Sequence, residues 1–181
     1  MVPNWKENIG IFPAVAKAKK AAVLNASNRT ITFQGGGITG VLGETGYEKA
    51  VRHQQDWEAL KFLDETPITQ ANRELAPGTE AAYSKSDFGY IYHINAPSRR
   101  VDSLLLKEGT KAILQHANQK RLQCIVLTAA GTATFGNRSA YLGLIKGIEA
   151  FCHQYPESDL RIVLLNWETD IVTHVKALKN H

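Results

Sequence analysis

The chain has 181 residues, the length of one ordinary domain, and 44% of them are hydrophobic. Its 21 Lys and Arg outnumber its 17 Asp and Glu, but the basic side chains are scattered along the chain, which argues against a nucleic-acid interface. No apolar run approaches the ~18 residues of a membrane span, and two cysteines, Cys124 and Cys152, are too few for a disulfide scaffold. We therefore expect a cytoplasmic monomer with no membrane contact, no specific nucleic-acid partner, no metal and no cofactor.

The first half of the chain predicts one strand and one helix. The apolar run 21–24 is predicted to be a strand that ends in a turn at Asn25, a residue type common in turns. Residues 47–62 have the pattern of a helix. Residues 65–87 contain two prolines and a glycine, and they predict a long connection.

The second half alternates short apolar runs with longer amphipathic ones. Runs that are apolar on both faces are typical of central strands, and apolar residues spaced by three and four are typical of helices. Strands are predicted at 90–94, 124–127 and 162–165, and helices at 101–116, 141–152 and 171–178. This alternation predicts an α/β fold, with a mostly parallel sheet and helices on both faces. We find no linker, so residues 1–181 are predicted to form a single domain.

Two segments of small, nearly uncharged residues follow predicted strands. They span 25–40, with three consecutive glycines, and 128–136. Ligands of open α/β sheets bind where strands end, and backbone N–H groups of such segments can hold phosphate oxygens. Neither segment matches a P-loop, and Ile38 and Thr39 follow the glycines where a P-loop has Lys and Ser or Thr. The dinucleotide fingerprint is a weak match as well, because it needs spaced glycines and these three are consecutive. Glycines 35–37 alone would indicate a flexible turn, but two such segments favour a bound diphosphate.

Four motifs resemble those of the macro domains, the ADP-ribose-binding family. Asn-Ala-Ser-Asn at 25–28, followed by Gly-Gly-Gly-Ile-Thr-Gly at 35–40, resembles the macro-domain signature Asn-Ala-Ala-Asn…Gly-Gly-Gly-Val-X-Gly. Residues 77–81, 92–97 and 131–136 resemble three further macro-domain motifs, in family order. The resemblance covers most of the chain. It implies a divergent macro-like domain with three α/β/α layers around a central mixed, mostly parallel sheet.

The resemblance also implies a ligand site. Asn28 would hydrogen-bond the distal ribose, the glycines would wrap that sugar and the neighbouring phosphate, and the second segment would hold the diphosphate. Asn8 stands where macro domains carry the Asp that reads adenine. Trp167, just after a predicted strand, is expected either to be a core or rim aromatic or to border the adenine cleft. The candidate ligand-binding residues are Asn8, Ile9, Asn25, Asn28, Gly35, Gly36, Gly37, Ile38, Gly131, Thr132, Ala133, Thr134, Phe135, Gly136 and Trp167.

Three residues are the candidates for catalysis: Asn28, Thr39 and Glu44. One class of hydrolytic macro domains carries Asp where Thr39 stands, and a threonine hydroxyl is no general base near neutral pH. Glu44 loosely resembles the catalytic Glu of poly-ADP-ribose glycohydrolases, and its alternative is a solvent-facing helix charge. His93 falls on a predicted strand and is expected to be a hydrogen-bonded core histidine.

Three functions remain open from the sequence. The first is a domain that binds ADP-ribose or an ADP-ribosylated protein and hydrolyses mono-ADP-ribose or a related derivative by attack of water at C1″. The second is a non-catalytic ADP-ribose reader. The third is a degenerate macro fold that binds another nucleotide or a protein partner, because both family aspartates are replaced, at Asn8 and at Thr39.

Overall fold

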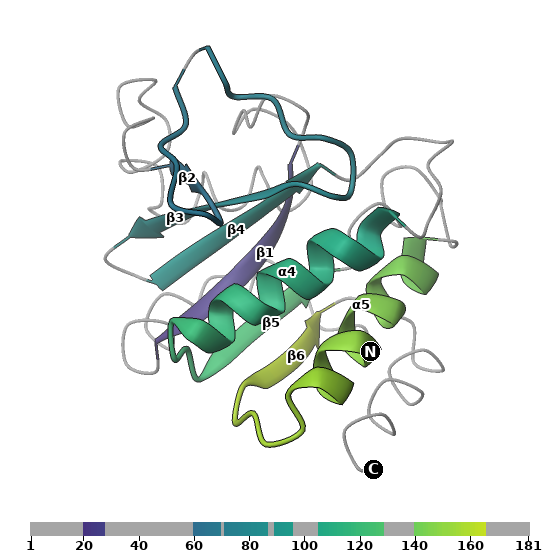
Figure 1. The fold of residues 1–181 in the computed structure, drawn as a ribbon. Coiled ribbons are helices and arrows are strands. Elements are labelled where there is room, and N and C mark those ends of the chain that lie inside the picture. The colour runs from purple at the N-terminus through teal and green to yellow at the C-terminus, as the bar shows by residue number, and fades with distance from the viewer. Residues whose placement is uncertain are drawn as a thin grey trace.

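The computed structural model describes residues 20–27, 60–69, 71–86, 89–95, 105–128 and 140–165. This part of the chain holds a six-stranded sheet and two helices (Figure 1). In chain order the elements are β1 (Ala21–Ser27), β2 (Leu60–Phe62), β3 (Ala81–Ser86), β4 (Gly89–Asn95), α4 (Leu105–Gln119), β5 (Cys124–Thr128), α5 (Ala140–Gln154) and β6 (Arg161–Leu165). Among these residues, neither helix is long and apolar enough to cross a membrane.

The sheet is mixed and mostly parallel, as predicted. Its strands lie in the order β2-β3-β4-β1-β5-β6. β1 pairs in parallel with β4 on one side and with β5 on the other, and β5 pairs in parallel with β6. β3 is antiparallel to both β2 and β4. The chain passes from β4 over β1 to β5 through α4, and from β5 to its neighbour β6 through α5. β1 is thus a central strand.

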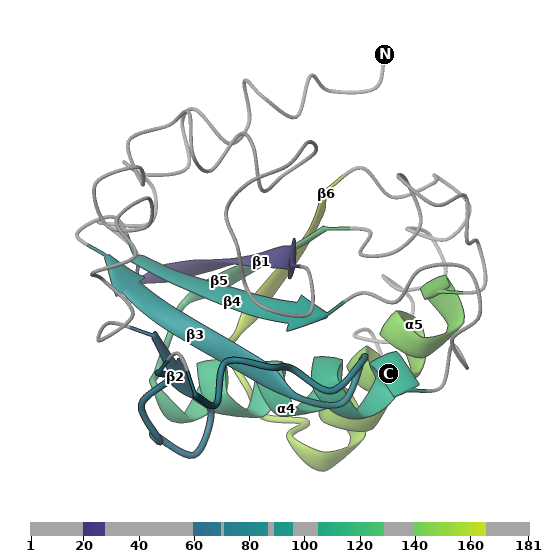
Figure 2. The same cartoon turned by 90° about the horizontal axis from the view of Figure 1, so that it is seen from above.

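Helices α4 and α5 pack on one face of the sheet, as Figure 2 shows from above. Side chains of a strand point alternately to its two faces, so Ala22 and Leu24 of β1 meet these helices in the main core. Val23, Asn25 and Ser27 therefore face the other way. The helix predicted at 171–178 and most of the one predicted at 47–62 lie outside the described residues.

A glycine pair joins α4 to the sheet. The N–H of Gly109 donates to the carbonyl oxygen of Gly78 at 3.1 Å, and the N–H of Gly78 donates to the carbonyl oxygen of Asn95 at 2.9 Å. A Cβ atom on Gly109 would overlap the Gly78 oxygen, and Gly78 has a φ of +70°. Gly109 weakens the helix pattern of the sequence, yet α4 continues through it. The close contact with Gly78 requires a residue without a side chain, which explains why a glycine stands inside this helix.

Two predictions for residues 47–87 were wrong. Residues 60–62 are the strand β2 rather than the end of a helix, because they pair with β3 and Leu60 packs in a small core with Ile68, Leu75 and Ala82. Residues 65–87 are not only a connection, because they contain β3. The strands and helices predicted between residues 90 and 165 are confirmed, with ends shifted by a few residues.

Candidate functional site at the carboxyl edge of the sheet

The parallel strands end together at one edge of the sheet. Ser27, at the end of β1, lies opposite Asn95, at the end of β4. Thr128 ends β5, and its hydroxyl donates to the carbonyl oxygen of Leu24 in β1 at 2.9 Å. Each of the three strand ends thus carries a small neutral polar residue that is at least nine-tenths buried. In open α/β sheets this edge is where ligands bind.

A buried polar row links three strands on the face away from α4 and α5. Asn25 Nδ2 lies 3.3 Å from His93 Nδ1, and His93 Nε2 lies 3.2 Å from Ser84 Oγ. Burial lowers the pKa of His93 to about 3, so its ring is neutral at pH 7. An amide N–H on Nδ1 leaves the ring proton on Nε2, which then donates to Ser84. His93 is thus the predicted hydrogen-bonded core histidine.

Asn25 is the one predicted site residue that the structure describes. Its prediction as a turn was wrong, because β1 continues to Ser27 and the Asn25 carboxamide bonds to the imidazole of His93 on the neighbouring strand. The residue is fully buried. It fixes β1 against β4 two residues before the edge, and its contact with a ligand stays a prediction.

The end of β4 is held by the loop that precedes β3. Asn95 Nδ2 donates to the carbonyl oxygen of Leu75 at 3.0 Å, and the Asn95 carbonyl accepts from Gly78. The acceptor Leu75 is itself held in place, because its side chain is buried in the small core with Leu60 and Ile68. The motif at 77–81 therefore ties the carboxyl edge to α4.

Ser27 is the feature of this edge that sequence reasoning missed. The residue is 5% exposed, and its Oγ atom is buried without a hydrogen-bond partner among the described residues. Native proteins pair most buried polar side chains, so such an atom needs an explanation. The sequence offered only one signal, a Ser where the Asn-Ala-Ala-Asn signature has Ala.

Solved macrodomain structures have a similar fold. The Oceanobacillus iheyensis macrodomain, as a single-residue variant, has a TM-score of 0.65 and 18% identity, covering 92% of this chain and 84% of that one. The Trypanosoma brucei macrodomain in complex with ADP-ribose has a TM-score of 0.61 and 18% identity, covering 88% and 63%. This chain has the macrodomain fold. It also covers 23% of the alphavirus P23pro-zbd structure, at 13% identity and a TM-score of 0.60.

These likenesses are of fold rather than of sequence. No protein-family model matches the chain, and no curated protein sequence matches it. The chain spans 63% or less of the alphavirus and Trypanosoma chains, so the macrodomain fold accounts for only part of those proteins. The α/β class and the resemblance to macro domains are confirmed at the level of the fold.

The predicted ligand residues follow three of the strands in the chain. Asn28 directly follows β1, residues 131–136 begin three positions after β5, and Trp167 comes two positions after β6. β5 is the parallel neighbour of both β1 and β6, so all three strands end at the same edge of the sheet. Apart from Asn25, all the predicted site residues lie outside the described residues: Asn8, Ile9, Asn28, Gly35, Gly36, Gly37, Ile38, Thr39, Glu44, Gly131, Thr132, Ala133, Thr134, Phe135, Gly136 and Trp167.

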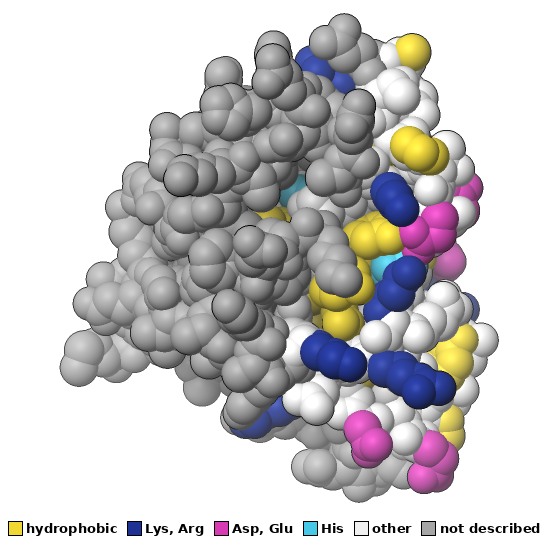
Figure 3. All heavy atoms as spheres, turned by 90° about the vertical axis from the view of Figure 1, so that its left-hand side faces the viewer, with side chains coloured by type: hydrophobic (Ala, Val, Ile, Leu, Met, Phe, Trp, Pro, Cys, Tyr) yellow, Lys and Arg dark blue, Asp and Glu magenta, His cyan; other side chains and the backbone are white. Residues whose placement is uncertain are grey.

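A second polar cluster lies on the β2–β3 side, toward the end of α4. Tyr83 donates to Glu65 Oε2 at 2.5 Å, and Lys120 Nζ lies 2.9 Å from Glu65 Oε1. His116 Nε2 lies 3.3 Å from the same oxygen, and its Nδ1 is 2.7 Å from the Tyr92 hydroxyl. Figure 3 shows acidic, basic and hydrophobic side chains close together on this side. The cluster fastens the turn after β2 to α4.

The pKa values of this cluster follow from its contacts. The hydrogen bonds from Tyr83 and Lys120 lower the pKa of Glu65 to about 2, although its side chain is 45% exposed. Burial raises the pKa of Tyr92 and lowers that of His116. At neutral pH the cluster is therefore an ionised carboxylate held by a phenol and an ammonium group. No sequence pattern indicated this cluster, because Glu65 falls in the predicted connection.

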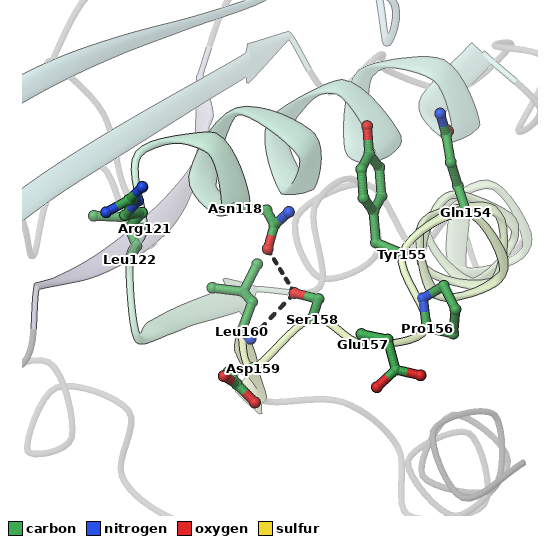
Figure 4. A pocket seen from close by; sticks show the side chains of 10 residues that line it. All are labelled: Asn118, Arg121, Leu122, Gln154, Tyr155, Pro156, Glu157, Ser158, Asp159 and Leu160. Atoms are coloured by element: carbon green, nitrogen blue, oxygen red, sulfur yellow. Dashed lines mark hydrogen bonds between the residues drawn. The ribbon is translucent and has the colours of Figure 1, made fainter.

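A groove with both polar and apolar lining lies at the opposite, amino edge of the sheet. It has a volume of about 650 Å³ and lies between the turn after α4 and the loop before β6 (Figure 4). Ser158 Oγ donates to Asn118 Oδ1 at 2.7 Å and accepts the N–H of Leu160 at 3.2 Å. These groups satisfy one another. Within the described ranges, no group of three His, Cys, Asp or Glu side chains could hold a metal ion.

Proposed function

We propose that the protein binds ADP-ribose, free or attached to a protein, at the carboxyl edge of β1, β4 and β5. The observation that carries this proposal is that the two small-residue segments follow two adjacent strands of the sheet. One leaves β1 and the other leaves β5, and these strands are parallel neighbours. Two glycine- or alanine-rich segments that begin side by side can enclose a diphosphate. The Trypanosoma structure of the same fold is a complex with ADP-ribose.

The roles within the site follow the macro-domain motifs. Asn28 orients the distal ribose, and backbone N–H groups of Gly35–Ile38 and of Thr132–Gly136 bind phosphate oxygens. Phe135 packs on the distal ribose, and Trp167 borders adenine. Hydrogen bonds from backbone dipoles suit a site whose described strand ends, Ser27, Asn95 and Thr128, are all neutral.

Hydrolysis is the finer function to test. With Asn28 and the two segments holding the distal ribose, a water positioned at C1″ would displace the linked side chain, and catalysis would come from orientation. Thr39 supplies no general base. If Glu44 supplies one, the mechanism resembles that of a glycohydrolase; if no group does and no ligand is released, the domain is a reader.

Calorimetric titration with ADP-ribose tests the binding. We expect saturable heat for the wild-type chain and affinity at least about tenfold lower for Asn28→Ala, because one side-chain contact to the sugar is lost. Gln123→Ala removes an exposed carboxamide at the opposite edge and serves as the matched control, with unchanged affinity. No heat from the wild type at millimolar ligand would refute the proposal and favour a degenerate fold.

A release assay separates the enzyme from the reader. A mono-ADP-ribosylated protein is incubated with the chain, and free ADP-ribose is followed over time. Release that Asn28→Ala removes and Glu44→Ala leaves intact supports catalysis by orientation. Release that depends on Glu44 supports a glycohydrolase-like mechanism instead. Binding without release identifies a reader.

A further inference from the structure

The Ser27 hydroxyl has no hydrogen-bond partner among the described residues. Ser27 is the last residue of β1 and lies opposite Asn95 on β4. Its side chain is on the face away from α4 and α5, the same face as Asn25. Asn95 nearby donates to Leu75, and Asn25 is bonded to His93. Neither amide is bonded to Ser27, whose Oγ stays buried and unpaired.

One other buried hydroxyl in the described part of the chain is unpaired, that of Thr110. Thr110 lies in the middle of α4, where its side chain packs against Gly147 of α5. Its position is accounted for by helix packing. Ser27 has no such explanation, because it ends a strand at the edge where the ligand is proposed to bind. Both hydroxyls thus lack a hydrogen-bond partner, one at the edge of the sheet and the other between two helices.

We propose that the Ser27 hydroxyl forms its missing hydrogen bond with a hydroxyl of the ligand's distal ribose, and so favours nucleotides that carry this second sugar. The proposal rests on the proposed function. A serine hydroxyl both donates and accepts, as a sugar hydroxyl does, whereas a phosphate oxygen only accepts. The neighbouring Asn28 is the residue assigned to the same ribose. The Asn-Ala-Ala-Asn signature has Ala in this position, and Ala offers no hydroxyl to the ligand.

Ser27→Ala should have opposite effects on the free and the bound protein. Without ligand, the variant loses a buried polar atom that had no partner, so we expect its Tm to rise by about 2–4 °C. With ADP-ribose, the variant lacks one hydrogen bond, so we expect affinity about three- to tenfold lower. ADP, which lacks the distal ribose, should bind wild type and variant equally.

Thr110→Val is the matched control. It also removes an unpaired buried hydroxyl, with little change in volume, and should raise Tm while leaving both affinities unchanged. Calorimetry with ADP-ribose and ADP, together with thermal unfolding of the free proteins, covers all arms. Ala is the residue of the macro-domain signature, so the Ser27 variant is expected to fold.

The outcomes separate this inference from the proposed function. If the wild type binds neither nucleotide, the proposed function fails and this inference fails with it. If the wild type binds ADP-ribose and Ser27→Ala binds it equally well, only the inference is overturned, and Ser27 is a structural residue like Thr110. Equal losses for ADP and ADP-ribose would place the contact on the diphosphate and overturn the assignment to the sugar.

Discussion

Replacing Gly109 by Ala tests how α4 is fixed to the site. A Cβ atom there would overlap the carbonyl oxygen of Gly78 and lie 2.7 Å from Ile94 Cδ1. Overpacking of this kind costs about 1–3 kcal/mol. Moving Gly78 away breaks its two backbone hydrogen bonds, with Gly109 and Asn95, at about 1 kcal/mol each. The better helix propensity of Ala offsets about 1 kcal/mol. We expect a loss of about 2–4 kcal/mol.

Urea unfolding followed by circular dichroism measures this loss. Gln119→Ala, at the exposed end of the same helix, is the control and should change the free energy of unfolding by less than about 0.5 kcal/mol. ADP-ribose affinity should also fall in Gly109→Ala, because the displaced Gly78 holds Asn95 at the carboxyl edge. Helix propensity alone predicts the opposite sign for stability. A Gly109→Ala protein as stable as the wild type would therefore refute the proposed role of this contact.

Two further predictions concern the polar groups. Tyr83→Phe removes the phenol that donates to Glu65 and should cost about 1 kcal/mol in urea unfolding, since the exposed carboxylate is partly resolvated; an unchanged midpoint would contradict the role of the bond. The pKa of His93, at about 3, lies below its unfolded value near 6.5, so the unfolded chain binds a proton that the folded chain does not. The contribution of His93 to the free energy of unfolding should be fully present above about pH 6.5 and be lost as the pH falls toward 3. Proton NMR that shows the His93 ring titrating near pH 6 in the folded protein would refute this.

The sequence predicted the second half of the fold well because its signals are local. The runs around Ile125 and Val163 are apolar on both faces, and the face of α5 repeats with the helical period. β2 and β3 were missed for a physical reason. β2 has three residues, and Ala81, Ala82 and Ser84 of β3 are small and weakly β-forming, so both strands depend on pairing with distant parts of the chain.

The candidate site could be recognised by motif but not by its hydrogen bonds. Asn25 was predicted to end its strand in a turn, but its side chain bonds to His93, which is 68 residues away in the chain. Ser27 carried no local signal beyond its difference from Ala. An unpaired hydroxyl is a property of a whole neighbourhood, so no spacing rule could reveal it. The Glu65 cluster depends in the same way on three separate elements.

The carboxyl edge of the sheet and the Glu65 cluster lie near opposite ends of α4. Near the start of the helix, Gly109 and Gly78 hold a carboxyl edge whose described strand ends are neutral and buried. Toward its end, His116 and Lys120 meet the Glu65 carboxylate in a partly exposed ionic cluster. Charges that are paired with each other on the β2–β3 side do not compete for the ligand. The proposed nucleotide would therefore be recognised by hydrogen-bond geometry, in which a single added hydroxyl such as that of Ser27 can change which sugar is preferred.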